Sequence, residues 1–379
     1  MVFQVVEECA NVLVCYRDDV RSGLIKTVSC DNCGDVAVED MDVDEFNVYK
    51  NEVLSLRLRD DAIPKTFQAR TVPQAQEEEV KLELQQMVDK GIIVPVTEAT
   101  EWSSPMLVRR KTNGKLRVCM DPRYLNTFLL RAVYPMPNIE TIYPKVMGAT
   151  RFSKLDMTQG FWHIQLDEAS SHLCTFSTPY GQIRYLRMPF GLSPAPEVFH
   201  RMVGDVIKDL KGVTHFVDDV LIWGKTKEEH DTRLKEVLSR LEKAGFAINK
   251  DKCDVNKTKV MFLGHRVNGI CIRPNPVKVE IVTHFPQPTN VEELRRLLGV
   301  ATYISKFIPR FSTLTEPLRR LLHEETAFCW EEEQTRAFNN IKKALKSEPV
   351  LFIFNPRLPV QIGTDANGTG LGAVLLQNN

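Results

Sequence analysis

Residues 214–223, THFVDDVLIW, form an apolar, strand-prone run that two adjacent acids, Asp218 and Asp219, interrupt. Two neighbouring aspartates inside such a run indicate the tip of a tight hairpin. A second strand-prone stretch, FSKLDM at 152–157, places Asp156 in the same kind of apolar setting. An acid is costly to bury unless it is paired or binds a metal, so we expect the three acids to meet at one sheet edge. Such an edge suits a pair of Mg²⁺ ions, although turn-capping aspartates are the commoner alternative.

The stretch between Trp102 and Tyr134 is strongly basic, and its segment LVRRKTNGKLRVCMD predicts a hairpin closed by a Thr-Asn-Gly turn. A basic hairpin suits phosphate groups, whereas a solvated surface is the usual explanation of a single charge run. After Asp156, the residues MTQGFW predict a turn whose backbone amides could cradle a triphosphate. Further on, YLRMPFGLSPAP places a glycine in a proline-flanked turn just before a helix.

Length and composition limit the class of protein. A chain of 379 residues with 43% hydrophobic residues predicts two to three folded domains. It contains no apolar run of about 18 residues, so an integral membrane protein is excluded, and no signal peptide is evident. The nine cysteines indicate a reducing, intracellular and cytoplasmic setting. Cys30 and Cys33 form a single C-x-x-C without a second pair, so ordinary thiols are favoured over a zinc or redox site.

Helices are expected to alternate with the strands. Apolar residues at helical spacing predict one helix before Gly91 and another after Ser193, the latter bearing residues up to Leu210. Capping boxes are predicted at Thr226 with Glu229 and at Thr289 with Glu292. Glycine-rich phosphate loops are missing, which excludes dinucleotide-binding folds. We therefore predict an α+β architecture with helices on one face of a largely antiparallel sheet.

Five blocks appear in a fixed order, and a sixth and a seventh follow them: KTNGKLRVCMDPRYLN, KLDMTQGF, FGLSPAPEVF, FVDD, FLGH, NVEELRRLLGVATYISKFIPRFS and IGTDANGTGLGAVLLQ. Together they resemble the reverse transcriptases of LTR retrotransposons, specifically of the gypsy class, over about residues 62–379. The last block is similar to the opening of the family's RNase H domain.

The resemblance implies a right-hand polymerase of fingers, palm and thumb, followed by a connection and a truncated RNase H-like domain. The expected boundaries are an acidic leader at 1–61, fingers and palm at 62–270, thumb at 271–325, connection at 326–358 and an incomplete RNase H start at 359–379. Ten acidic and three basic residues between Asp31 and Asp61 favour a solvated, disordered leader or a remnant of an upstream region.

The resemblance also implies site residues. The family's palm acids correspond to Asp156, Asp218 and Asp219. Asp156 and Asp218 would hold two Mg²⁺ ions, for which Mn²⁺ can substitute. Asp219 would complete the negative charge of the site. The positions that match the family's contacts to the incoming dNTP are Arg110 (or Lys111, if the alignment slips by one), Arg117, Phe161, Phe190 and Gly191. Phe161 would exclude a 2′-hydroxyl by its bulk, with a core aromatic as the alternative.

Phe262, Leu263, Gly264 and His265 resemble the primer grip, and residues 250–278, with seven basic and two acidic side chains, favour a surface that follows a nucleic-acid backbone. Asp121 and Arg123 occupy motif positions that a local ion pair explains equally well. Ser193 and Pro194 depart from the family's Lys-Asn, and no loss is expected because proline is tolerated at a helix start.

The predicted function is RNA-directed DNA polymerisation: transfer of a nucleotide from dNTP to a primer 3′-hydroxyl on an RNA or DNA primer-template, without membrane attachment. RNase H activity is expected to be absent, because Asp365 is the single acid of that site in the chain. Two alternatives are an inactive nucleic-acid-binding relic and a host-domesticated interaction protein that works through its acidic leader. Oligomeric state is open.

Overall fold

The computed structural model describes residues 14–15 and 47–377, apart from 111–113, 115, 132–133, 138, 159, 309, 324–327, 348–350, 354–357 and 368–369. The expectations about Cys30, Cys33, Lys111 and the Thr112–Asn113 turn therefore lie outside the described residues. Among the residues that are described, no helix combines the length and apolarity needed to cross a bilayer.

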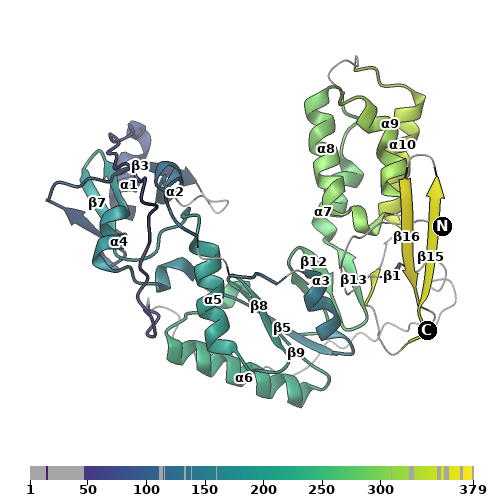
Figure 1. Ribbon diagram of the computed structural model, residues 1–379, viewed down its shortest axis with the longest axis horizontal. Helices are drawn as coiled ribbons and strands as arrows, with labels where there is room; N and C mark the ends of the chain where they lie inside the picture. Colours follow the sequence, from purple (N-terminus) through teal and green to yellow (C-terminus); the bar gives the residue numbers. More distant parts are fainter. Residues whose placement is uncertain are drawn as a thin grey trace.

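A four-stranded antiparallel sheet, here called the central sheet, stands in the middle of the molecule (Figure 1). Its strand order is β10 (Asp254–Lys257), β5 (Arg151–Asp156), β9 (Asp219–Gly224) and β8 (Val213–Phe216). The helices α5 (Ala195–Ile207) and α6 (Lys227–Ala244) pack against each other and against this sheet. Strands β5 and β9 are the two segments whose acids are of interest, and the structure makes them direct neighbours.

A second, five-stranded sheet is built from segments that lie before β5 in the chain and from two strands that follow it. Its order is β2 (Ile93–Val96), β7 (Gly181–Tyr185), β6 (Thr175–Thr178), β3 (Ser104–Arg110) and β4 (Leu116–Met120). Among the strands of the described residues, β3 and β6 are the one pair in parallel, so the prediction of a largely antiparallel architecture is confirmed. The helices of this part are α1 (Glu77–Asp89), α2 (Arg123–Asn126) and α4 (Glu168–Leu173), and α3 (Ile139–Ile142) leads into the central sheet.

The C-terminal part is built on a third sheet and four helices. The sheet order is β1 (Val14–Cys15), β14 (Leu351–Phe352), β13 (Cys271–Pro274), β12 (His265–Val267) and β11 (Val260–Phe262). The helices are α7 (Pro276–His284), α8 (Val291–Tyr303), α9 (Phe311–Arg320) and α10 (Glu332–Lys346), and the hairpin β15 (Gln361–Asn367) with β16 (Gly370–Leu376) follows. Buried residues of this part belong to one hydrophobic cluster, which also contains residues between 142 and 152 and Leu221 and Trp223 of β9. The border expected at 325 stays a prediction.

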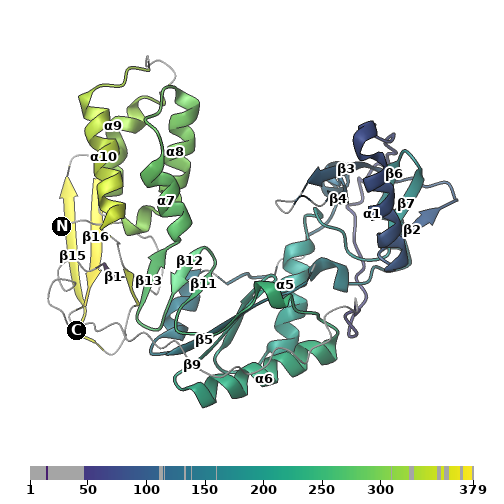
Figure 2. The ribbon, with the colours of Figure 1, turned by 180° about the vertical axis from the view of Figure 1, so that it is seen from behind.

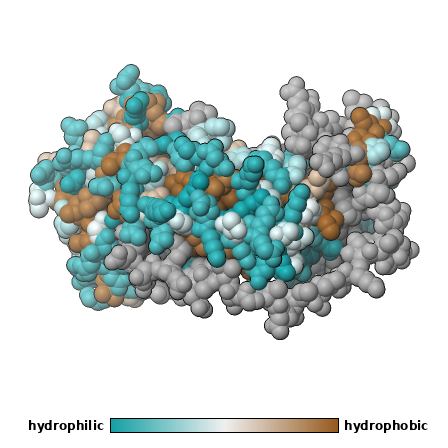
Figure 3. All heavy atoms as spheres, turned by 90° about the horizontal axis from the view of Figure 1, so that it is seen from below, coloured by the Kyte–Doolittle hydropathy of each residue, from teal (hydrophilic) through white to brown (hydrophobic). Residues whose placement is uncertain are grey.

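The five-stranded sheet of β2, β7, β6, β3 and β4, with its helices, stands at one end of the central sheet in both ribbon views (Figures 1 and 2). The C-terminal helices α7 to α10 stand at the other end. The face seen from below is mainly hydrophilic, with apolar residues in scattered patches (Figure 3).

Three helix-end predictions need correction. Thr226 caps α6 as expected, but the Glu229 carboxylate accepts the N–H of Lys225 instead of closing the capping box. The cap of α8 is Asn290 rather than Thr289, because its side chain accepts the Glu293 N–H at 2.9 Å and asparagine is a strong N-cap. Helix α5 ends at Ile207, so Leu210 lies beyond the helix on which it was expected.

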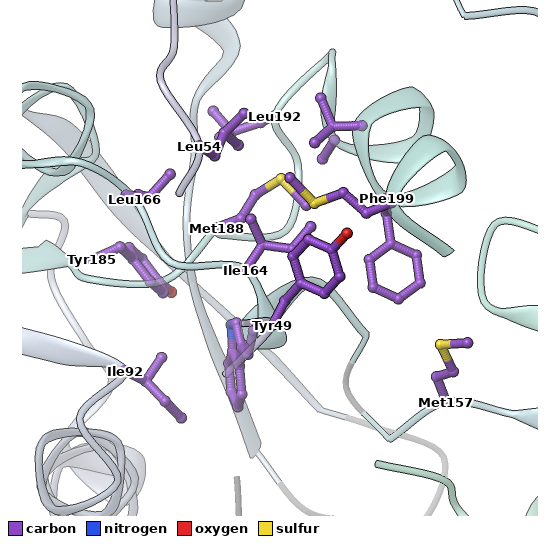
Figure 4. Close-up of a cluster of buried hydrophobic side chains, with 14 of the residues drawn as sticks. Tyr49, Leu54, Ile92, Met157, Ile164, Leu166, Tyr185, Met188, Leu192 and Phe199 are labelled. Atoms are coloured by element: carbon purple, nitrogen blue, oxygen red, sulfur yellow. The ribbon is translucent and has the colours of Figure 1, made fainter. Parts of the chain in front are cut away.

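Residues 47–61, the described part of the expected acidic leader, are mostly exposed, but two of them are anchored in the core. Tyr49 and Leu54 are buried among side chains of the turn after β5 and of α5 (Figure 4). The segment's backbone also bonds to the central part of the chain: Tyr49 N–H donates to His163 O and Leu54 N–H to Gln165 O, both at 2.8 Å. The acidic composition concealed this packing because the buried apolar residues are few and widely spaced.

Candidate active site

The three acids of the sequence analysis come together at one end of the central sheet. Asp156, the last residue of β5, is paired in register with Asp219, the first residue of β9. Val217 and Asp218 form the two-residue turn between β8 and β9, and Asp218 is exposed. The predicted meeting of the acids is therefore found, at the edge where the strands of the sheet end. The cause is that β5 and β9, the two inner strands, are antiparallel neighbours.

Two lysines balance the charge of these acids. Lys154 Nζ lies 2.9 Å from Asp219 Oδ1, and Lys252 Nζ lies 3.4 Å from Asp156 Oδ1. Partial burial raises the pKa of the Asp156 carboxyl, while Lys252 opposes that shift and Asp218 adds to it. Burial likewise raises the pKa of the Asp219 carboxyl, against the effect of Lys154. A cationic ligand that entered this edge would relieve the same electrostatic strain.

In the described part of the chain, no group of three or more His, Cys, Asp or Glu side chains is arranged to hold a metal ion. The assignment of Asp156 and Asp218 as metal ligands therefore stays a prediction. The donor set still fits Mg²⁺, because this ion typically binds one or two protein carboxylates and takes its other ligands from water and substrate phosphates.

A buried histidine holds the turn that follows β5. His163 Nδ1 lies 3.0 Å from Gly160 O, and the Ala247 N–H donates to His163 Nε2 at 3.0 Å. Burial lowers the pKa of His163 to about 4, so the ring is neutral and can donate at one nitrogen and accept at the other. The turn expected to cradle a triphosphate is thus tied to the loop after α6.

Three of the residues predicted to contact a nucleotide form one stack. The Arg117 guanidinium lies over the Phe190 ring, 3.8 Å from its centroid, and the Phe161 and Phe190 centroids are 5.1 Å apart. Phe161 also meets Phe199 of α5 edge to face. Arg110, in contrast, forms an ion pair with Glu79 of α1 at 3.0 Å and donates to Gly114 O, so it lies outside this stack.

The turn around Gly191 is fixed by a residue that the sequence analysis did not single out. Asn126 Nδ2 donates to Gly191 O at 2.9 Å, and Asn126 Oδ1 accepts the Ser193 N–H at 2.8 Å. Pro194 is the N-cap of α5 and is accommodated there, as expected.

The ion pair of Asp121 with Arg123 is present and is joined by Arg70, and these guanidinium groups hold the pKa of Asp121 at about 2.

The FLGH segment is the hairpin turn between β11 and β12. Leu263 and Gly264 both have positive φ, at 48° and 76°, which is typical of a two-residue hairpin turn. Tyr303 of α8 anchors the turn, because its hydroxyl donates to Leu263 O at 3.1 Å and its ring stacks on His265.

Asp365 lies in β15, opposite Gly372 in the pairing with β16, and its side chain is outside the described residues.

Comparisons with known proteins agree with this geometry. Residues 108–267 match the family described as reverse transcriptase (RNA-dependent DNA polymerase), and residues 330–379 match the RNase H-like domain found in reverse transcriptases. The chain carries a reverse transcriptase domain. The central sheet, α5 and α6 lie within the first of these matched ranges, and the RNase H-like domain follows it.

Relatives extend the similarity beyond the domain. The Tf2-3 and Tf2-7 transposon polyproteins of Schizosaccharomyces pombe are each 35% identical over 277 residues, which is 73% of this chain and 21% of theirs. The chain thus spans about a fifth of the length of these curated relatives. The structure of a foamy viral protease-reverse transcriptase in complex with dsDNA has a TM-score of 0.76 at 20% identity, covering 88% of this chain and 72% of that one. A second, with an RNA/DNA hybrid, has a TM-score of 0.73 at 19% identity, covering 87% and 46%. These structures establish the right-hand fold.

Several residues of the reverse transcriptase domain escaped the sequence analysis. Lys154, Lys252 and Asn126 contact the acids or the nucleotide-pocket turn, yet isolated lysines and asparagines have no distinguishing pattern in a single sequence. For Lys154, the position two residues before Asp156 on the same strand was a usable signal, because alternate residues of a strand face the same side.

The hairpin turn at Gly264 should not tolerate a side chain. In Gly264→Ala, a Cβ would overlap the Tyr303 hydroxyl, in addition to the strain of a positive φ. We expect a loss of roughly 2–4 kcal/mol in the free energy of unfolding. Gly148→Ala is the matched control, since Gly148 has φ of 75° but nothing within 4 Å of the added Cβ, and it should lose only about 1–2 kcal/mol. Urea unfolding of both variants measures the difference, and equal losses would contradict the proposed anchoring by Tyr303.

The buried His163 predicts a loss of stability in acid. Its pKa is lower in the folded chain, at about 4, than the ordinary value of 6.5, so stability is present above pH 6.5 and is lost as the pH falls towards 4. Between pH 7 and pH 5 the linkage amounts to about 2 kcal/mol for this residue. In His163→Gln, an amide oxygen replaces Nε2 as acceptor and does not titrate. Urea unfolding at both pH values should therefore show a smaller pH effect in the variant, and an unchanged effect would count against a neutral His163.

Proposed function

We propose that the chain is an RNA-directed DNA polymerase of a gypsy-class LTR retrotransposon, which adds deoxynucleotides to a primer 3′-hydroxyl on an RNA or DNA template. The observation that carries the proposal is the direct pairing of Asp156 with Asp219, beside Asp218, inside a reverse transcriptase domain. Carboxylates concentrated at one sheet edge with lysine counter-ions are suited to cation-assisted phosphoryl transfer.

The chain's own groups have separate tasks in this reaction. The Arg117 guanidinium, held over the Phe190 ring, donates to a triphosphate, and Arg110 can leave Glu79 for a phosphate because that pair is half exposed. Phe161, packed on Phe190 and Phe199, forms the floor under the sugar. The FLGH turn, fixed to α8, positions the primer end.

Asp156 and Asp218 would hold Mg²⁺, with Asp219 adding negative charge. When bound, Mg²⁺ supplies Lewis-acid stabilisation of the attacking and leaving oxygens. Lys154 and Lys252 oppose the rise in the pKa of Asp219 and of Asp156 and hold these carboxyl groups in place until substrate arrives, since each lysine offers an ammonium group to one of them.

Primer-template and dNTPs are the proposed partners. Support comes from the foamy viral structures, whose titles name dsDNA and an RNA/DNA hybrid, and from the basic residues of 250–278. Among the described residues, the cysteines 174, 253, 271 and 329 are free thiols, which fits the proposed intracellular setting.

Primer extension by the purified chain tests the function. A homopolymer template with a complementary oligonucleotide primer and labelled dNTP should give extension with Mg²⁺ or Mn²⁺ and none with EDTA. Binding of the same primer-template without extension would support the inactive relic instead.

If the chain were an interaction protein, its acidic leader would carry the function. Two shortened chains test whether the described part of that leader, residues 47–61, contributes to folding instead. The chain 62–379 should unfold at a clearly lower temperature than 47–379, because it lacks the buried Tyr49 and Leu54, each of which contributes about 1.5–3 kcal/mol. Differential scanning calorimetry measures the two transitions, and equal values would show that 47–61 is not part of the folded core.

A further inference from the structure

The turn that presents Asp218 contains a strained residue. Val217 has φ of 55°, in the left-handed region that β-branched residues rarely adopt, and it is the first of the two turn residues. Glycine is the usual residue with positive φ in a tight hairpin turn. Backbone strain of this kind persists only where surrounding contacts determine the conformation.

A histidine of α5 makes the contact that fits this requirement. The Val217 N–H donates to Nδ1 of His200 at 3.3 Å. His200 is buried, with 2% of its surface exposed, so its ring cannot exchange this bond for water without moving the helix. On the other side of the turn, the Met157 N–H donates to Asp218 O at 3.3 Å, which joins the turn to the end of β5.

The position of the His200 ring is itself fixed. It stacks on His215 of β8 with centroids 4.0 Å apart, and His215 Nε2 lies 2.8 Å from His200 O, towards which it donates. Tyr134 meets the His200 ring edge to face on another side. Gly204, one turn further along α5, leaves room for His215, since an added Cβ would lie 3.1 Å from its Cε1. Burial, and then the neighbouring His215, lower the pKa of His200 to about 4, which agrees with a neutral ring whose Nδ1 accepts.

We propose that His200 is a positioning residue for polymerisation: its Nδ1 holds the Val217 amide, and thereby holds the strained turn that sets Asp218 beside Asp156 and Asp219. His200 touches neither substrate nor the acids, so it acts only through the backbone of the turn. The inference rests on the proposed function for its effect on rate, but the hydrogen bond itself can be tested without it.

Two substitutions separate the acceptor from the bulk of the ring. His200→Leu removes the acceptor and keeps an apolar side chain, whereas His200→Asn places an amide oxygen close to the position of Nδ1. In primer extension, His200→Leu should lower kcat about tenfold or more while leaving the KM for dNTP and the Kd for primer-template within about threefold. His200→Asn should restore kcat to within about threefold of the wild type. His215→Phe, which keeps a ring in the stack and leaves the Val217 bond, is the matched control and should stay near the wild-type kcat.

Hydrogen exchange of the Val217 amide gives a readout that does not need activity. In ¹⁵N-valine-labelled protein, this amide should exchange at least about tenfold faster in His200→Leu than in the wild type, and His200→Asn should retain the protection. If the wild-type chain is inactive in primer extension, the proposed function fails and the exchange data still decide the hydrogen bond. An active His200→Leu variant with wild-type kcat, a His200→Asn variant as impaired as His200→Leu, or an unprotected wild-type amide would each overturn the positioning role.

Discussion

Asp156→Asn and Asp218→Asn should each abolish primer extension, with a fall in kcat of at least about a thousandfold, while primer-template binding changes little. The two carboxylates act on charge that develops in the transition state, and asparagine keeps their size but cannot supply the negative charge. Affinity for the duplex comes mainly from basic side chains along the nucleic-acid backbone, which neither substitution touches. Single-turnover extension and fluorescence-anisotropy binding measure the two quantities separately.

Asp209→Asn provides the matched control for these variants. Asp209 is an exposed acid just after α5 with φ of 68°, a conformation that asparagine tolerates, so the change removes one charge without strain. It should leave extension near the wild-type rate. A residual activity in Asp156→Asn close to that of Asp209→Asn would refute the assignment of the palm acids as catalytic.

Phe161→Val should admit ribonucleotides, lowering the ratio of kcat/KM for dNTP over rNTP by about tenfold or more. Phe161 lies five residues beyond Asp156, and its ring is held between Phe190 and Phe199, with centroid distances of 5.1 and 5.5 Å. A ring fixed in this way cannot swing aside for a 2′-hydroxyl, so discrimination would be steric. The shorter valine opens that space, whereas the triphosphate and base-pairing contacts remain.

The same change removes packing, so stability must be measured in parallel; a cost of roughly 1–4 kcal/mol is expected. The ratio of the two kcat/KM values cancels a uniform loss of folded enzyme. Phe128→Val, a second half-buried aromatic that packs against Trp102 and Tyr124, is the control for a large-to-small change elsewhere and should leave the ratio unchanged. An unchanged ratio in folded, active Phe161→Val would make Phe161 a core aromatic only.

The local sequence was sufficient for the elements that bear the acids. Apolar, strand-prone runs around Asp156 and around the Asp218–Asp219 pair predicted two strands, and both are present as β5 and β9. Antiparallel pairing of these strands then brings their acids to one edge, which is why the site could be expected before the fold was known. The helix caps were less predictable, because threonine and asparagine compete for the same position at 289–290.

By itself, the sequence determined the motif order, the strands carrying the acids and the basic hairpin, since these depend on residue type and on spacing within a few positions. Only the tertiary structure decided the rest. Lys154 and Lys252 meet the acids, Tyr49 and Leu54 are buried despite their acidic surroundings, and His200 reaches the Val217 amide from another element. These contacts form only when helices and loops pack against the sheet. A single sequence contains no periodic signal for a lone lysine or histidine whose partner is far away along the chain.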